Sequence, residues 1–213
     1  MEEVLTRLLA VFVAFFVVVD PIATAPLFAS LTAAHPAAER ARTARRGVLV
    51  AAGVLLLFAL AGAWLLGTLG IGLSAFRIAG GLLLFLLSVD MIMVRQTGLR
   101  ATTPVEDEEA RERADVSVFP LAIPLIAGPG AMTTVVLLMG AARGSLARQA
   151  EVLCVLAAVL VLTFACLRGA ARLARLLGIT GINVVTRVSG LVTAALAVQF
   201  VLDGIAQAFP RAG

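Results

Sequence analysis

The chain has 213 residues, of which 61% are hydrophobic and 14% are charged, and its mean hydropathy is +1.06. A soluble domain is about half apolar and about a quarter charged, so this composition excludes an ordinary soluble enzyme or binding domain. The formal net charge is +4, and all 17 basic residues other than the histidine are arginines. Because most of them fall between apolar stretches, they indicate membrane topology and no nucleic-acid partner.

Six apolar stretches are long enough to cross a lipid bilayer. They are predicted at Leu8–Leu31, Gly47–Leu69, Ser74–Val94, Val116–Gly140, Val152–Leu167 and Val184–Ala208. The expected fold class is therefore an all-α membrane protein with six transmembrane helices.

The arginines predict the orientation of these spans. Eleven of them follow the first, third and fifth spans, and four lie on the opposite side. The eleven are Arg40, Arg42, Arg45, Arg46, Arg95, Arg100, Arg111, Arg113, Arg168, Arg172 and Arg175, and the four are Arg7, Arg143, Arg148 and Arg211. Because arginine accumulates on the cytoplasmic side, we expect both termini to lie outside the cytoplasm. The polar stretch 95–115, with its acidic run Glu106–Glu109, is expected to be a cytoplasmic connector.

The first span contains a carboxylate and two prolines near its middle: Asp20, Pro21 and Pro26. A proline cannot donate a backbone hydrogen bond, so each one frees a carbonyl group in the preceding turn. Lipid offers no partner for a freed carbonyl or for a carboxylate, so the protein must supply one. We therefore predict a broken helix near the middle of the bilayer.

The fourth span repeats this pattern, because Pro124 and Pro129 have the same five-residue spacing as the first pair. Leu-Gly-Ile also recurs, at 69–71 and 177–179, and Arg-x-x-Gly recurs at 77–80 and 187–190. The repeat divides the chain into halves 1–94 and 116–213. Since each half has three spans, the second half is expected to be inverted, with spans one and four broken at matching positions. Such inverted repeats with broken helices are typical of secondary transporters.

A pair of breaks creates a site for a small zwitterion. A half-helix that starts at a break offers free N–H groups to a carboxylate, and one that ends there offers carbonyl groups to an ammonium group or Na⁺. The expected substrate-binding residues are Asp20, Ala23, Thr24, Ala25, Ala127, Gly128, Gly130, Thr133 and Thr134. The small side chains in this set favour a small substrate.

Asp20 has two interpretations. An ionisable group inside a span indicates function by default, here binding an ammonium group or a coupling Na⁺. Alternatively, it forms a structural ion pair with Arg77 or Arg187, or caps a neighbouring half-helix. Both arginines lie near span ends, where extension toward the lipid headgroups is the simplest interpretation. The sequence has no metal-ligand cluster, phosphate loop or nucleophile motif, so we expect neither an enzyme nor a cofactor.

Several stretches together resemble the MarC family, which includes SnatA-type neutral amino-acid transporters. They are Asp20–Phe28, Pro120–Thr134, Asn183–Gly190 and Val198–Ile205. The resemblance implies six spans in an inverted repeat in a bacterial or archaeal plasma membrane. It also implies transport of glycine, alanine, serine or threonine, coupled to Na⁺ or H⁺.

Two neighbouring positions depart from the family pattern, which usually has Gly-Asn where this chain has Ala23 and Thr24. A hydroxyl group therefore replaces a side-chain amide inside the first motif. The alternative function is export of other small metabolites or drugs, and homo-oligomer formation is left open.

Overall fold

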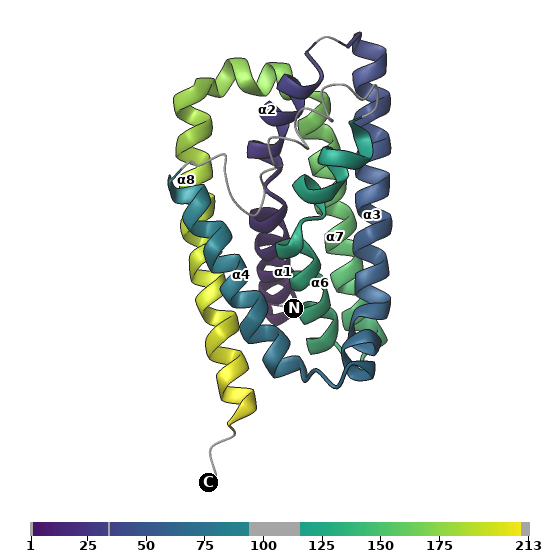
Figure 1. Cartoon of the computed structure of the whole chain (residues 1–213), viewed down its shortest axis with the longest axis vertical. Coiled ribbons are helices and arrows are strands. Elements are labelled where there is room, and N and C mark those ends of the chain that lie inside the picture. The colour runs from purple at the N-terminus through teal and green to yellow at the C-terminus, as the bar shows by residue number, and fades with distance from the viewer. Residues whose placement is uncertain (1, 34, 94–115, 210–213) are drawn as a thin grey trace.

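The computed structural model describes residues 2–33, 35–93 and 116–209, and the regular elements in these ranges are helices. In chain order they are α1 (Glu2–Val19), α2 (Pro21–Leu31), α3 (Ala37–Thr68), α4 (Leu73–Met93), η1 (Ser117–Ile126), α6 (Pro129–Ala141), α7 (Leu146–Arg168) and α8 (Ala170–Ala208). Figure 1 shows them as one bundle of roughly parallel and antiparallel rods.

The all-helical membrane class is confirmed. Five helical segments of the described chain are long and apolar enough to cross a membrane, and α1 and α2 together count as one of them. A sixth candidate is the pair η1 and α6, which is bent by 57° at a short break. All six apolar stretches identified in the sequence therefore correspond to helices.

Several arginines that were predicted to lie between the spans are inside helices in the structure. Helix α3 begins at Ala37, so Arg40, Arg42, Arg45 and Arg46 lie in its first turns and not in a loop. Arg172 and Arg175 likewise lie in the first part of α8. A hydropathy window finds only the apolar part of a helix, whereas arginine is a good helix former and lets the helix continue past the apolar zone. The predicted connector, 95–115, lies outside the described residues.

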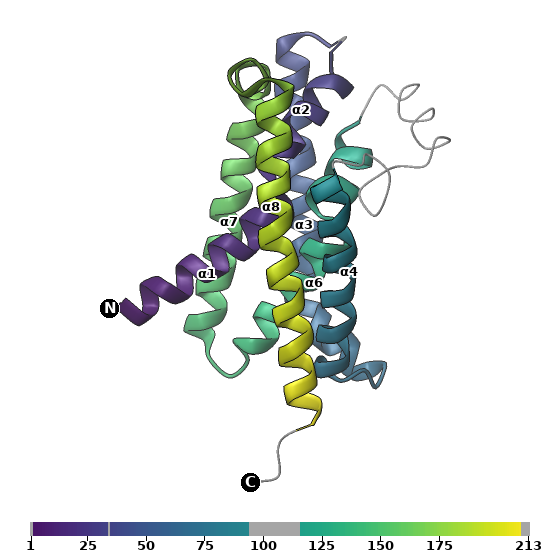
Figure 2. The same cartoon turned by 90° about the vertical axis from the view of Figure 1, so that its left-hand side faces the viewer.

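Helices α4 and α8 form the most extensive helix pair, and they run antiparallel along most of their length (Figures 1 and 2). Small residues bring their backbones together: Gly81 lies against the carbonyl of Ala197, and Gly190 lies against Ile92. Close approach at small residues is the usual way in which helices associate in lipid, where there is little hydrophobic drive between them.

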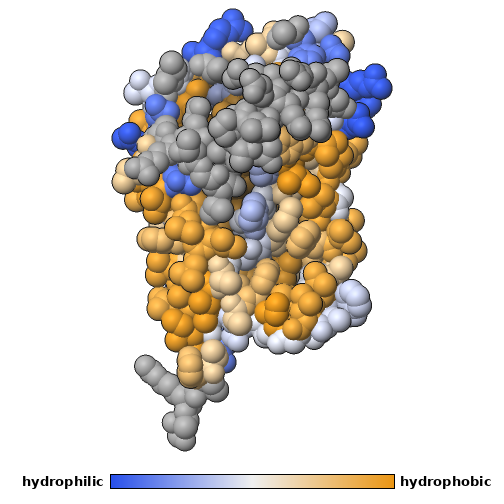
Figure 3. All heavy atoms as spheres, viewed as in Figure 1, coloured by the Kyte–Doolittle hydropathy of each residue, from blue (hydrophilic) through white to orange (hydrophobic). Residues whose placement is uncertain are grey.

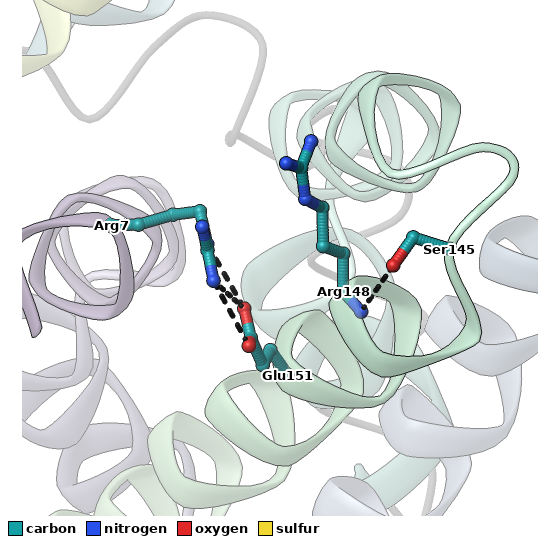
Figure 4. A network of polar contacts seen from close by, with 4 residues as sticks. All are labelled: Arg7, Ser145, Arg148 and Glu151. Carbon is teal, nitrogen blue, oxygen red and sulfur yellow. Dashed lines mark hydrogen bonds and ion pairs between the residues drawn. The ribbon is translucent and has the colours of Figure 1, made fainter. Parts of the chain in front are cut away.

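Helix α1 lies at the centre of Figure 1, where it packs against α6 and α7, and Figure 2 shows that its N-terminal end leaves the bundle obliquely. Arg7 on this end forms a two-pronged ion pair with Glu151 on α7 (Figure 4). Its Nε and Nη2 atoms donate to the two carboxylate oxygens, each at 3.0 Å. The pair fixes the oblique end of α1 to the rest of the bundle.

The surface separates into zones (Figure 3). Hydrophilic residues gather at one end of the bundle and a broad apolar zone lies below them. The end near the start of α3 and the start of α8 carries most of the described arginines, and we call it the arginine-rich end. Exposed side chains such as Leu57, Trp64, Leu82 and Leu191 belong to the apolar zone, as expected of a surface that faces lipid.

A pair of glycine variants tests how closely the helices pack. A Cβ atom at Gly80 of α4 would overlap Cγ2 of Thr133 of α6, whereas one at Gly53 of α3 would meet nothing within 4 Å. We expect Gly80→Ala to lower the unfolding free energy by about 1–3 kcal/mol through overpacking. Gly53→Ala should leave it unchanged or raise it by up to about 1 kcal/mol, since alanine favours helix. Thermal unfolding of the purified variants in detergent measures both, and equal midpoints would contradict the close α4–α6 contact.

Candidate functional site

The first break lies at Asp20, between α1 and α2. Its backbone is left-handed, with φ 49° and ψ 67°, in a described chain where the other positive-φ residues are glycines. Asparagine and aspartate tolerate this conformation better than other residues with a Cβ atom. The Asp20 carboxylate accepts a hydrogen bond from the Ala23 N–H at 3.3 Å and so caps α2. The side chain is 1% exposed, so this carboxylate is buried inside the protein.

The residues after Asp20 accommodate the break locally. Pro21 is the first residue of α2, a position where a helix needs no N–H donor. The buried hydroxyl of Thr24 donates to the Val19 carbonyl at 3.4 Å, which gives a partner to a carbonyl at the end of α1. Ala25 is fully buried, and Ala23 is half-buried. Helix α2 continues through Pro26, so the interruption in the described structure lies at Asp20 and not at this second proline.

The second break is longer than the sequence pattern indicated. Within η1, Phe119 and Ile123 have extended backbones, and each precedes a proline. A proline disfavours the helical conformation of the residue before it, so Pro120 and Pro124 each interrupt the segment. Pro120 lies shortly before Pro124 in the chain. The spacing of Pro124 and Pro129 did not predict that Pro120 also interrupts the helix.

Helix α6 starts from this break. Its N-cap residue, Gly128, is extended and provides no side-chain cap, and Pro129 is the first residue. The N–H groups of Gly130 and Ala131 therefore have no partner within the helix, because the first turn of an α-helix lacks preceding carbonyls. The Met132 N–H already bonds to the Gly128 carbonyl at 3.0 Å. The start of α6 thus presents two backbone donors and the positive end of a helix dipole.

A narrow cavity lies beside the start of α6 at the second break. Its volume is only about 10 Å³, and Val18 near the end of α1 is one of its lining residues. Gly130 lies so close to Val18, Leu84 and Leu87 that a Cβ atom there would be 2.9–3.3 Å from their side chains. Of the predicted site residues, the cavity is lined by Gly128, Pro129 and Gly130.

The remaining predicted residues do not line the cavity. Asp20 and Pro21 follow Val18 in the chain, and Ala127 is buried next to Gly128. Thr133 is 5% exposed and turns its methyl group toward Gly80 of α4. Thr134 is fully buried, and its hydroxyl group has no hydrogen-bond partner among the described residues. The cavity wall also includes leucines of α4, which sequence spacing could not identify because they come from another span.

Arg77 is more deeply buried than its position near the start of α4 suggested. It is 8% exposed, and within residues 2–33, 35–93 and 116–209 its side chain has no hydrogen bond or ion pair. Arg187, at the position that the sequence pattern pairs with Arg77, is exposed. The burial of Arg77 does not fit extension toward lipid headgroups, whereas for Arg187 this extension stays a prediction. An ion pair of Asp20 with either arginine is not among the described salt bridges.

No group of three or more metal-ligating side chains occurs in the part of the chain that the structure describes. Asp20 is the charged residue of the first break, and the next residues along the chain, Pro21, Ile22 and Ala23, are uncharged. The residues predicted for the site thus contribute one carboxylate, backbone dipoles and hydroxyl groups.

The fold and this site define a multi-pass helical membrane protein. Residues 5–209 match the family described as "MarC family integral membrane protein". The chain belongs to the MarC family, and it is an integral membrane protein.

Three curated relatives illustrate this similarity. UPF0056 membrane protein YvbG of Bacillus subtilis is 35% identical over 94% of both chains. UPF0056 membrane protein YhcE of Escherichia coli is 34% identical, with 93% of this chain and 92% of the relative covered. A UPF0056 membrane protein of Archaeoglobus fulgidus is 33% identical, with 93% and 92% covered. These names specify neither substrate nor catalytic activity, and no solved structure matches the chain.

Variants of Asp20 test its structural role at the break. Alanine loses the capping oxygen and is disfavoured in the left-handed conformation, so Asp20→Ala should lower stability by about 1–3 kcal/mol. Asp20→Asn keeps a capping oxygen and tolerates this backbone, so it should lie within about 0.5 kcal/mol of the unaltered protein. Chemical or thermal unfolding in detergent measures the two, and an equal loss in both would indicate a charge-dependent contact instead.

Replacement of Arg77 tests the cost of its buried charge. A buried charge without a partner is unfavourable, and an apolar side chain of similar length removes that cost. We expect Arg77→Met to stabilise the protein by about 1–3 kcal/mol. The matched change at the exposed position, Arg187→Met, should alter it by less than about 0.5 kcal/mol. A lower melting temperature for Arg77→Met than for Arg187→Met would show that Arg77 makes a stabilising contact.

Proposed function

We propose that this protein is a secondary transporter of small neutral amino acids, with glycine, alanine, serine and threonine as the candidate substrates. The observation that carries the proposal is the close approach of the end of α1, next to the first interruption, to the start of α6 at the second. Val18, two residues before the buried Asp20, lines the cavity together with Gly130 at the uncapped start of α6. In the proposed site, the Asp20 carboxylate and the positive end of α6 would both contact the substrate.

A zwitterion matches this arrangement of charge. The N–H groups of Gly130 and Ala131 and the dipole of α6 would bind the carboxylate of the substrate. Asp20 would bind its ammonium group or the coupling ion, Na⁺ or H⁺. Ala23, Thr24 and Ala25 on the first half and Ala127, Gly128, Thr133 and Thr134 on the second would complete the surroundings.

The lining of the cavity favours a small substrate. Its wall is formed by valine, leucine, proline and alanine side chains and by glycine backbone, and its volume in this conformation is about 10 Å³. Substrate binding would therefore require the surrounding helices to separate, and a bulky amphiphilic drug would require a larger separation than an amino acid. This supports amino acids over the alternative of drug export.

The inverted repeat and its broken helices near the middle of the membrane belong to this proposal, and several features support them. The predicted halves run in opposite directions in Figure 1: α1 rises where α6 descends, α3 descends where α7 rises, and α4 rises where α8 descends. Gly70 and Gly178, from the two Leu-Gly-Ile segments, both have positive φ, at 68° and 61°. Each of the two glycines lies just before the third span of its half. A positive φ is a backbone conformation that glycine adopts without strain.

Neighbour relations between the halves support the repeat as well. Helix α3 packs on η1 and α6, and its counterpart α7 packs on α1 and α2. We infer that alternating access moves one set of these helices against the other around the cavity. The positive-inside rule then gives a plasma-membrane protein with the arginine-rich end in the cytoplasm and both termini outside.

Transport by the purified protein in liposomes tests the proposal. We expect gradient-dependent flux of labelled glycine, alanine, serine or threonine, with a Na⁺ or pH gradient as the driving force. Protein-free liposomes and a labelled acidic amino acid serve as controls. Absence of flux and of binding for all four neutral amino acids would reject this substrate class, and flux of another small metabolite would support the exporter alternative.

Asp20→Asn tests the coupling role. The variant keeps the cap but cannot carry charge, so transport should fall by at least about tenfold while the melting temperature stays near that of the unaltered protein. Asp203→Asn is the matched control, because that carboxylate accepts a bond from Gln199 on the same helix at 2.7 Å and does not line the cavity. Equal flux in both variants would show that the Asp20 charge is dispensable.

A further inference from the structure

A second cavity lies at the arginine-rich end, away from the breaks. It has a volume of about 210 Å³ and shares no lining residue with the first. Four helices contribute to it: the end of α2, the start of α3, the end of α7 and the start of α8. The residues that matter for its chemistry are Phe28, Thr32, Arg40, Leu167, Arg168 and Ala170.

The charge on this cavity is positive. Arg40 comes from the first turn of α3 and Arg168 is the last residue of α7, so two separate helices direct arginines to one space. Its described lining includes no carboxylate, and Glu39 beside Arg40 is exposed. Neither arginine side chain forms an ion pair or hydrogen bond with another described residue; the Arg168 guanidinium lies 5.9 Å from the centre of the Phe164 ring. Two like charges held near one cavity without a counter-ion favour an anion.

The backbone adds to this preference. Helix α3 has 32 residues, and its N-cap, Pro36, has no side-chain oxygen to accept the N–H groups of the first turn. Ala37, at the start of this helix, lines the cavity. The N-terminal end of a helix carries partial positive charge that reinforces the two guanidinium groups. The Thr32 hydroxyl in the lining already donates to the Phe28 carbonyl at 2.7 Å, so we do not count it among the donors to the anion.

The other walls are apolar. Phe28 is 2% exposed and Leu167 is 2% exposed, and both face the cavity from the bundle interior. Arginine binds phosphate oxygens in two-pronged geometry and is the preferred residue for this group. A phosphate with an attached hydrocarbon portion matches two arginines, a helix N-terminus and an apolar wall.

We propose that this cavity binds a phosphoryl group, as carried by an anionic phospholipid or by a soluble phosphate. The site is separate from the amino-acid site and would hold α2, α3, α7 and α8 together at the arginine-rich end. It does not depend on which substrate the protein transports.

Thermal unfolding of the purified full-length protein with added ligand provides the test. The probes are phosphatidylglycerol in mixed micelles, phosphatidylcholine, whose trimethylammonium group neutralises the phosphate charge, and inorganic phosphate. A ligand that binds only the folded state raises the melting temperature, and the rise grows with the logarithm of the ligand concentration relative to its Kd. We expect phosphatidylglycerol to raise it more than phosphatidylcholine does. A rise with inorganic phosphate as well would show that the phosphoryl group suffices, and a rise with the lipid alone would identify the headgroup as the ligand.

Charge variants localise the effect. Arg40→Gln and Arg168→Gln should each weaken the apparent affinity by about fivefold, and Arg40→Lys should retain part of it. Arg42→Gln is the matched control, because Arg42 is exposed on the same helix and does not line the cavity. Melting temperatures without ligand show whether each variant is folded. The proposal is overturned if neither phosphatidylglycerol nor inorganic phosphate stabilises the protein. It is also overturned if Arg42→Gln weakens binding as much as Arg40→Gln.

Discussion

Every backbone polar group inside lipid needs a partner within the protein, and this constraint governs the structure. An unbroken helix meets it automatically, and most spans of this chain do so. At Asp20 and along η1 the ladder is interrupted, and the chain supplies substitutes: the Asp20 carboxylate for the Ala23 N–H, and the Thr24 hydroxyl for the Val19 carbonyl. At the start of α6 no described side chain caps the helix, and this is where the cavity lies.

In the proposed site, the contrast between the two breaks would provide the polarity. The first break is capped by the Asp20 side chain and would contribute a buried carboxylate, while the second has no side-chain cap and would contribute backbone donors. Gly130 packs closely against the side chains of Val18, Leu84 and Leu87, which brings the start of α6 near the end of α1. A site assembled from backbone has little sequence signature of its own beyond the prolines and glycines that permit it, so its substrate is hard to read from residue types alone.

The sequence is most informative about features that violate a strong local rule. Asp20, Pro21 and the Pro124–Pro129 pair are costly inside apolar runs, and the structure interrupts its helices beside them. The sequence is less informative where the outcome depends on neighbouring helices. The burial of Arg77 and the cavity between Arg40 and Arg168 require knowledge of which helix ends meet. The sequence did not predict that α3 begins at Ala37, before its arginines. Hydropathy identifies the apolar part of a helix and not the residue at which its backbone hydrogen bonding begins.

Gly178 has a mechanical consequence. Its φ of 61° and ψ of 178° interrupt α8, so residues 170–177 form a short rod and Thr180–Ala208 the membrane-crossing one. The break lets the short rod, which carries Arg172 and Arg175, follow a different axis from the long rod, which packs along α4.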